Sequence, residues 1–289
     1  MTPGALLLSA VAAAPALTIS LSPQRAPQGS VVVVTVTSSG PLASPVLVDG
    51  ERRIPLAPAG ARRWAALVGI DFETAPGGRP LLVEGDAADG SKVAASAPLR
   101  VVARKFAVQR LTVDPKFVEP PPEERERIER DREAFARAFA SSRPGRLWSG
   151  SFRRPAEGEI RGNFGARRVY NGRTRSRHAG LDVAAAQGAP VAAAAGGRVA
   201  LAGDFYFSGG SVVLDHGDGL FTMYFHLSRL DAKEGDVVAG GQRIGAVGAT
   251  GRVTGPHLHW AARLQGARID PTALLTLSLP PGPGPPGRP

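Results

Sequence analysis

Glycine and proline interrupt this chain so often that long helices have little room to form. The sequence contains 36 Gly and 26 Pro in 289 residues, and both residue types favour turns or end regular elements. Short runs rich in β-branched residues lie between them, as expected for buried strands. This pattern predicts a mainly β protein rather than a helical bundle. A hydrophobic fraction of 43% is sufficient for a packed core.

Residues 17–104 are predicted to form an immunoglobulin-like β-sandwich. Strands are expected at Val31–Val36, Val46–Val48, Arg63–Val68, Leu81–Glu84 and Leu99–Val102. Turn signals separate them at Asp49-Gly50, Pro76-Gly77-Gly78 and Asp89-Gly90. Short strands at this spacing are typical of a small sandwich. The module shows no catalytic constellation, so we expect it to act as a scaffold or a binding module.

Residues 105–145 are predicted to link this module to a second one through a single helix. A proline-rich breaker comes first, and Glu123–Ala140 then shows a helical pattern. Ile128, Phe135 and Phe139 form one apolar stripe along that helix. We expect the helix to dock between the two modules.

Both ends of the chain carry compositional signals. Ala5–Ala14 is an apolar run of ten residues, which has the length of a secretory signal core and is too short to span a bilayer. We predict a signal peptide over residues 1–16 and export to the periplasm or cell envelope. The segment has no Lys or Arg, and the alternative is a hydrophobic leader to a first β-strand. Residues 276–289, most of all from Pro280, are rich in Pro and Gly and are predicted to be disordered.

Cysteine content and charge exclude several classes of function. Cysteine is absent, so disulfides, thiolate metal sites and a cysteine nucleophile are ruled out. The net charge is +10, and 17 basic against 10 acidic residues after residue 145 supply most of it. A basic surface suits a polyanionic partner such as nucleic acid, anionic lipid or an acidic cell-wall polymer, and a compositional bias toward Arg explains the charge equally well. We find no nucleic-acid-binding motif and no apolar run long enough for an integral membrane segment in the body of the chain.

Residues 146–275 are predicted to form an antiparallel β-domain. Strand candidates are Val212–Leu214, Thr222–Phe225, Ile244–Val247 and His257–Ala261. Glycine-rich turns are expected at Gly196-Gly197, Gly209-Gly210, Gly217-Asp218-Gly219 and Gly240-Gly241.

All five histidines of the chain lie in this region, and four belong to short patterns that suit metal chemistry. They are His178, His216, His226, His257 and His259. His178 and Asp182 can bind one ion if the chain turns between them at Gly180. His257 and His259 alternate in a strand and therefore point to the same face. His226 is expected at a strand end, with Tyr224 on the same face as His226.

Two imidazoles and one carboxylate are the three protein ligands of a common catalytic zinc site, whose fourth position is kept for water. Zinc lowers the pKa of that water, and a neighbouring imidazole can take the proton. The helical His-Glu-x-x-His motif of other zinc proteases is absent. The residues therefore predict metal-assisted hydrolysis.

Residues 146–275 resemble the lysostaphin/LytM-type zinc metalloendopeptidases, which cut peptide cross-links of the bacterial cell wall. The matching segments are Asn163-Phe164-Gly165, Arg177–Val183, Gly188–Val191, Gly197–Val199, Asp215–Gly219, Tyr224–Leu227, Thr250–Trp260 and Ile269–Pro271. They follow the order of the family, and Thr250–Trp260 matches nearly in full. The resemblance implies a twisted antiparallel sheet with a substrate groove.

The resemblance also implies the roles of the site residues. His178, Asp182 and His259 are expected to hold one zinc ion per chain. His226 and His257 are expected to be the catalytic imidazoles beside the attacked carbonyl.

Five other positions near these motifs have weaker assignments. Asn163 is expected to lie in the groove or near the metal, where an asparagine holds some relatives in a latent form. His216 is expected to be structural. Arg173, Arg175 and Arg177 alternate before the first ligand and would share a face of a strand. They form either a basic rim of the groove or a solvated loop, and both readings stay open.

Together these inferences predict an exported zinc-dependent endopeptidase that hydrolyses peptide cross-links of peptidoglycan, at stem peptides or cross-bridges. A monomer or weak oligomer is expected. The alternative is a non-catalytic or latent regulator that binds the wall or another murein hydrolase.

Overall fold

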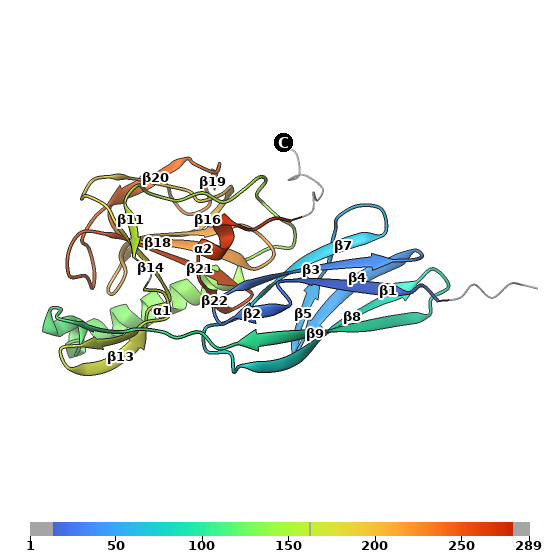
Figure 1. Ribbon diagram of the computed structural model, residues 1–289. Coiled ribbons are helices and arrows are strands. Elements are labelled where there is room, and N and C mark those ends of the chain that lie inside the picture. The colour runs from blue at the N-terminus through green and yellow to red at the C-terminus, as the bar shows by residue number, and fades with distance from the viewer. Residues whose placement is uncertain (1–13, 162, 280–289) are drawn as a thin grey trace, which may run out of the picture.

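The computed structural model of the protein describes residues 14–161 and 163–279. Figure 1 shows an elongated N-terminal β module that meets a second, rounder β module at one end. Helix α1 (Arg125–Ala140) lies along the second module. The mainly β fold with antiparallel sheets and a single long helix agrees with the prediction.

Two sheets form the N-terminal module. Their strands are β1 (Leu17–Ser22), β2 (Arg25–Pro27), β3 (Val31–Ser38), β4 (Leu42–Asp49), β5 (Arg52–Pro55), β6 (Ala57–Pro58), β7 (Arg63–Gly69), β8 (Gly77–Ala87) and β9 (Lys92–Val102). One sheet has the order β1-β3-β7-β6 and the other the order β2-β9-β8-β4-β5. Only the β2–β9 pair is parallel among these pairings of the described chain.

The core of this module lies between the two sheets. Val32, Val34 and Val36 alternate on β3 and are fully buried, as a strand with one face on the core requires. They belong to one apolar cluster with Leu81 and Leu99 of the other sheet. Burying each such side chain contributes roughly 1.5–3 kcal/mol. The sandwich arrangement therefore agrees with the prediction, while its immunoglobulin-like strand order stays a prediction.

The predicted turn at Pro76-Gly77-Gly78 is wrong. Strand β8 already begins at Gly77, and Gly78 pairs with Arg100 on β9. The long β9 offers a hydrogen-bonding partner to each residue at this end of the hairpin, and the ladder outweighs the turn preference of glycine. The chain instead turns just before Gly77.

The linker contains more regular structure than expected. It forms β10 (Val108–Leu111), two short 3₁₀ helices, η1 (Pro115–Phe117) and η2 (Pro122–Glu124), and then α1. Strand β10 pairs in parallel with β12 (Arg167–Tyr170), which pairs with β13 (Arg173–Arg177). The linker thus joins a small three-stranded sheet with a hairpin of the second module.

Helix α1 forms within two residues of its predicted start but docks differently. The Phe135 ring lies 4.9 Å from the ring of Phe205, and the Phe139 ring lies 5.3 Å from that of Phe221. These partners belong to the outer face of the large sheet of the second module. The prediction that α1 docks between the modules is wrong, because that apolar sheet face needs a cover and the stripe supplies it.

A ten-stranded sheet builds the second module. Its strands are β11 (Glu159–Arg161), β14 (Gly180–Ala184), β15 (Pro190–Ala192), β16 (Gly197–Phe205), β17 (Gly209–Asp215), β18 (Leu220–Leu230), β19 (Val237–Val238), β20 (Arg243–Val247), β21 (Leu258–Leu264) and β22 (Ala267–Ile269). The main path is β11-β14-β21-β18-β17-β16-β19. A short helix, α2 (Thr272–Leu275), follows.

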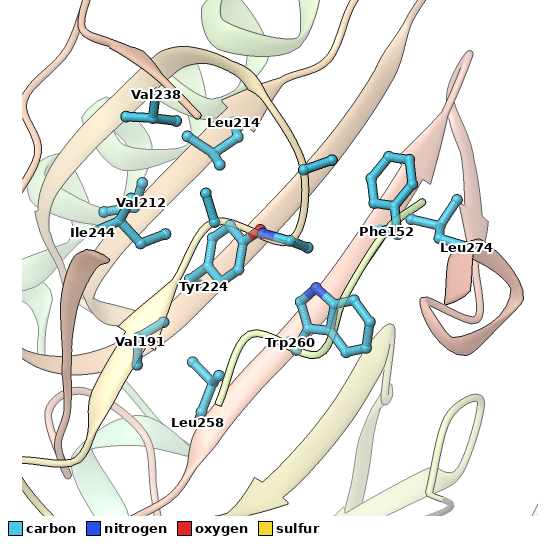
Figure 2. Close-up of a cluster of buried hydrophobic side chains, with 14 of the residues drawn as sticks. Phe152, Val191, Val212, Leu214, Tyr224, Val238, Ile244, Leu258, Trp260 and Leu274 are labelled. Carbon is cyan, nitrogen blue, oxygen red and sulfur yellow. The ribbon is translucent and has the colours of Figure 1, made fainter. Parts of the chain in front are cut away.

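The inner face of this sheet carries the main core, part of which Figure 2 shows. Tyr224 on β18 and Trp260 on β21 face each other in register and are fully buried. Val212, Leu214 and Ile244 pack around them. The two faces of the sheet thus have different covers, this core on one side and α1 on the other.

A buried chain of hydrogen bonds runs through this core and ends at His216. The Ala194 N–H donates to Tyr224 Oη at 2.8 Å, and the Tyr224 hydroxyl contacts Thr222 Oγ1 at 2.8 Å. Thr222 Oγ1 lies 2.7 Å from His216 Nε2, and His216 Nδ1 donates to the Gly196 carbonyl at 2.7 Å. Every polar atom of this chain is satisfied when His216 is neutral, which supports a structural role.

The predicted turn at Gly209-Gly210 is also wrong, because both glycines begin β17. A Cβ atom at Gly209 would lie 2.3 Å from Thr250 Oγ1, and one at Gly210 would lie 2.3 Å from the Leu227 carbonyl oxygen. Close approach of two backbones therefore requires these glycines. This approach brings the start of β17 against the loop after β20.

The two modules are held together by an ion pair and by close backbone packing. Arg268 on β22 donates from Nε and Nη2 to the two carboxylate oxygens of Asp71, both at 2.9 Å. Such a bidentate pair fixes orientation as well as position. Gly69 on β7 lies against Leu264 and Ala267, where a Cβ would come within 2.9 Å of both residues.

The predictions for the chain ends are largely outside the described residues. The signal-peptide prediction falls on residues 1–16, of which 1–13 are not described, and β1 begins at Leu17. The tail prediction falls on residues 276–289, of which 280–289 are not described. Leu277 and Leu279 pack partly buried against the main core, so the disorder predicted for 276–279 is wrong. No helix in the described ranges is long and apolar enough to cross a membrane.

We expect His216 to make stability depend on pH. Burial lowers the pKa of His216 from 6.5 to about 4. The unfolded chain therefore takes up a proton first as the pH falls, and stability is lost between pH 6.5 and about 4. Across this range the free energy of unfolding should fall by about 3 kcal/mol because of His216 alone. Urea unfolding of the metal-free wild type and of His216→Gln measures it, since only the wild type should show this component. Equal pH slopes for both proteins contradict the prediction.

Candidate metal centre and active site

Three buried side chains bring their ligand atoms to one point on the sheet. Asp182 on β14 pairs directly with His259 on β21, and His178 lies just before β14. His178 Nε2 lies 2.8 Å from His259 Nδ1. Asp182 Oδ1 lies 3.0 Å from His178 Nε2 and 3.1 Å from His259 Nδ1. The three residues predicted as metal ligands are therefore brought together in the structure.

The donor set and its spacing fit a divalent ion. In a tetrahedral site with bonds of about 2.0–2.1 Å, ligand atoms lie about 3.3 Å apart. The three atoms here form a triangle with sides of 2.8, 3.0 and 3.1 Å, so a small adjustment accommodates such an ion. Two imidazoles and a carboxylate leave one tetrahedral position for an exchangeable ligand. The metal-ligand role of these residues stays a prediction.

The second carboxylate oxygen of Asp182 is held by two other side chains. Asp182 Oδ2 accepts hydrogen bonds from Arg168 Nη2 at 2.6 Å and from Asn163 Nδ2 at 2.7 Å. Burial alone would raise the pKa of Asp182, but its close contacts with the His178 and His259 rings hold it well below its usual range. Asp182 is therefore a fixed carboxylate with one oxygen directed at the ligand cluster.

Hydrogen bonds also fix the orientation of His178. His178 Nδ1 donates to the Asn163 carbonyl at 3.0 Å, which leaves the Nε2 lone pair for the ligand cluster. Burial lowers the pKa of His178, and it lowers the pKa of His259 to about 4. Both imidazoles are thus neutral at neutral pH, as metal ligation requires.

The two predicted catalytic histidines lie beside this cluster. The His226 ring lies 5.0 Å from the His257 ring and 5.9 Å from the His259 ring. His226 Nδ1 donates to the Thr250 carbonyl, and His257 Nδ1 donates to the Gly255 carbonyl, both at 2.8 Å. His257 Nε2 lies 3.5 Å from Asp182 Oδ1. Each Nδ1–H is anchored on backbone, so each Nε2 is free to exchange a proton in the site.

The prediction that Tyr224 shares a face with His226 is wrong. Tyr224 points into the core, and its neighbour Phe225 stacks on the His259 ring at 5.5 Å. His226 lies within β18 and has a φ of +66°, which is strained for a residue with a side chain. This left-handed residue breaks the alternation of the strand and turns the His226 ring toward the site.

Gly180 serves close packing rather than the predicted turn. It starts β14 and pairs with Ala261. A Cβ atom there would lie 2.6 Å from His259 Nε2, 2.6 Å from the Trp260 carbonyl oxygen and 2.8 Å from the Ala261 Cβ. The missing side chain at Gly180 therefore makes room for the His259 ring.

Asn163 contacts the predicted ligand Asp182 through both ends of its side-chain amide. Its Nδ2 donates to Asp182 Oδ2, and its Oδ1 accepts from the Asp182 backbone N–H at 3.3 Å. The next residue, Phe164, packs its ring 5.5 Å from that of Phe72 and 6.4 Å from that of Phe106. The first module and the linker thus pack against the segment that contains Asn163, which in turn contacts Asp182.

A pocket of about 220 Å³ opens beside the histidines and contains several arginines. Its lining residues are Arg168, Tyr170, Ser176, Arg177, His178, Ala179, Phe207, Ser208, Phe225, His226, Arg252 and His259. Of the predicted basic rim, Arg173 forms an ion pair with Glu119, and Arg177 lies 3.8 Å from Glu73. The side chain of Arg175 is outside the described set.

Two functional candidates escaped the sequence interpretation, Arg168 and Arg252. Arg168 contacts Asp182, which is 14 residues away, and no pattern in the sequence signals that contact. Arg252 lies inside the segment Thr250–Trp260, and the motif by itself predicts no role for it. A basic residue inside a metal-site motif is the one signal that was available.

Comparison with known proteins shows the family of the chain. The profile of peptidase family M23 matches residues 176–271. A crystal structure from Pseudomonas aeruginosa, assigned to peptidase M23, shares 34% identity and superposes with a TM-score of 0.65. The match covers 86% of this chain and 94% of that one. The chain belongs to peptidase family M23.

Curated relatives match this M23 chain over about a third of its length. The DD-carboxypeptidase/endopeptidase Mpg of Neisseria meningitidis is 45% identical over 97 residues, which is 34% of this chain and 22% of that protein. The peptidoglycan DD-endopeptidase ShyA of Vibrio cholerae is 40% identical over 112 residues, which is 38% of this chain and 26% of that protein. The matched region is about a quarter of the length of these relatives.

We expect Gly180→Ala to weaken metal binding, because the new methyl group displaces the His259 ring. A disturbed support of a ligand typically costs roughly 10- to 100-fold in affinity. Competition with a chromophoric zinc chelator measures this. Gly255→Ala is the matched control near the site, since a Cβ there meets no atom within 4 Å. Equal zinc affinity of Gly180→Ala and the wild type contradicts the prediction.

Proposed function

We propose that this M23 chain is a zinc-dependent endopeptidase that hydrolyses peptide cross-links of peptidoglycan. The observation that carries the proposal is the convergence of His178, Asp182 and His259, with His226 and His257 beside them. The names of the relatives from Neisseria and Vibrio, both of which include endopeptidase, support the reaction class. The same names favour a location in the cell envelope, where a peptidoglycan substrate lies.

The residues of the chain divide the chemistry between them. When bound, a zinc ion supplies Lewis acidity that polarises a carbonyl and makes water acidic. His178, Asp182 and His259 would hold the ion, and Arg168 and Asn163 hold Asp182. Asp182 is the single anionic ligand beside two neutral imidazoles, so the ligand set would neutralise only part of the charge of the ion and would preserve its acidity.

Proton transfer falls to His226 and His257. Burial lowers the pKa of His226 well below its usual value, and the neighbouring His259 and His257 rings lower it further. A neutral imidazole with its Nδ1–H bound to a carbonyl presents Nε2 as the base. One ring can accept the proton of the attacking water, and the protonated ring then donates to the developing oxyanion or the leaving amine.

The alternative is a metal-bearing regulator that binds the wall without cutting it. The arrangement of His226 and His257 supports catalysis, because backbone carbonyls accept from both Nδ1–H groups and leave each Nε2 as the nitrogen that can exchange a proton. A pure binding module has no need of that arrangement. Unchanged muropeptides together with tight binding to purified wall favour the regulator.

We expect His259→Ala to lose both metal and activity, because it removes one of three ligands. His257→Ala should keep about one zinc ion per chain and lose roughly 10²- to 10⁴-fold in turnover, as removal of a general acid–base group does. Elemental analysis gives the zinc content, and mass spectrometry of products from defined cross-linked muropeptides gives the turnover.

The control for this pair is His216→Gln, which replaces a buried imidazole outside the site and should keep the zinc. Full turnover by metal-free wild type, or by His259→Ala, contradicts the proposed function.

A further inference from the structure

One arginine of the site pocket has no anionic partner. Arg252 lines the same pocket as His178, His226 and His259. Its neighbours in that pocket are committed elsewhere, Arg168 to Asp182 and Arg177 toward Glu73. Within the described ranges, the Arg252 side chain makes no ion pair and no hydrogen bond, and no carboxylate lines the pocket.

The guanidinium of Arg252 is nevertheless held in place. Its Cζ lies 4.7 Å from the centroid of the Tyr170 ring and 4.9 Å from that of the Phe207 ring. The backbone N–H of Arg252 donates to the Phe207 carbonyl at 2.9 Å. Cation–π contacts position the charge but provide no acceptor oxygen for its N–H groups. The five donors of this rigid group remain available to a ligand.

Burial makes this position costly for a charge. Burial lowers the pKa of Arg252, and the nearby Arg168 charge lowers it further. Arg252 is partly buried, and a partly desolvated cation without a counter-ion gains from an anion that enters the pocket. A carboxylate suits it best, because two parallel N–H···O bonds match the planar guanidinium.

We propose that Arg252 is a specificity residue that binds a carboxylate of the peptide substrate next to the scissile bond. The proposal rests on the proposed function, since it defines the substrate class of that same site. The carboxylate can belong to the side chain of a residue at the cross-link or to the C-terminus of a substrate peptide. The experiment separates these two sources.

The test uses two pairs of cross-linked peptides. In the first pair, one peptide has a side-chain carboxylate and the other has the corresponding amide. In the second pair, one peptide has a C-terminal carboxylate and the other has the corresponding amide. Zinc-loaded wild type should prefer the carboxylate form of one pair roughly 10- to 100-fold in kcat/KM, mainly through KM, as expected for a charge-assisted bond. Arg252→Met should lose this preference, and Arg252→Lys should keep part of it.

A charge-matched control isolates the local effect. Arg167→Gln removes one positive charge from an exposed position on the adjacent hairpin and should keep the preference. Zinc content and thermal unfolding show that each variant is folded. An unchanged preference in Arg252→Met, or an equal loss on carboxylate and amide forms, overturns the proposal.

Binding measurements distinguish this proposal from the proposed function. Calorimetry with the metal-free wild type and the same four peptides needs no turnover. A preference for the carboxylate form that Arg252→Met abolishes supports the subsite even if no peptide is cleaved. Cleavage without any such preference supports the enzyme and overturns the role of Arg252.

Discussion

The site depends on the register between strands β14 and β21. Their antiparallel pairing places Asp182 directly across from His259, so backbone hydrogen bonds set the distance between these ligands. A shift by one residue would turn Asp182 and His259 to opposite faces of the sheet. His178 follows from this pairing, because it lies just ahead of β14. Gly180 has no side chain, which leaves room for the His259 ring beside β14.

Support for these ligands reaches beyond the second module. Arg168 holds Asp182 and also contacts Gln109 on the linker strand β10, at 3.2 Å from Nε to Oε1. Asn163 holds Asp182 on its other side and is followed by Phe164, which packs against aromatic residues of the first module and the linker. The positions of the metal ligands therefore depend on contacts with segments that carry no catalytic group.

Local patterns made much of the fold predictable, and long-range contacts account for the rest. The alternation of His257-Leu258-His259 and the β-branched run at Val31–Val36 each predict extended backbone, and the chain is extended at both places. The sequence could not predict that Tyr224 and His226 point to different faces of the sheet. The left-handed backbone at His226 interrupts the alternation of side chains along the strand. Nor could the contact of Arg168 with Asp182, since it arises only after β12 and β14 are in place.

The packing of Phe164 limits how far the protein can be shortened. A fragment restricted to residues 146–275 would lose the ring contacts from Phe72 and Phe106, and Phe164 and Leu181 would face water. Those side chains adjoin Asn163 and Asp182, so solvent would enter beside the ligands. Transplanting the second module alone into another scaffold therefore requires a substitute apolar surface at this position.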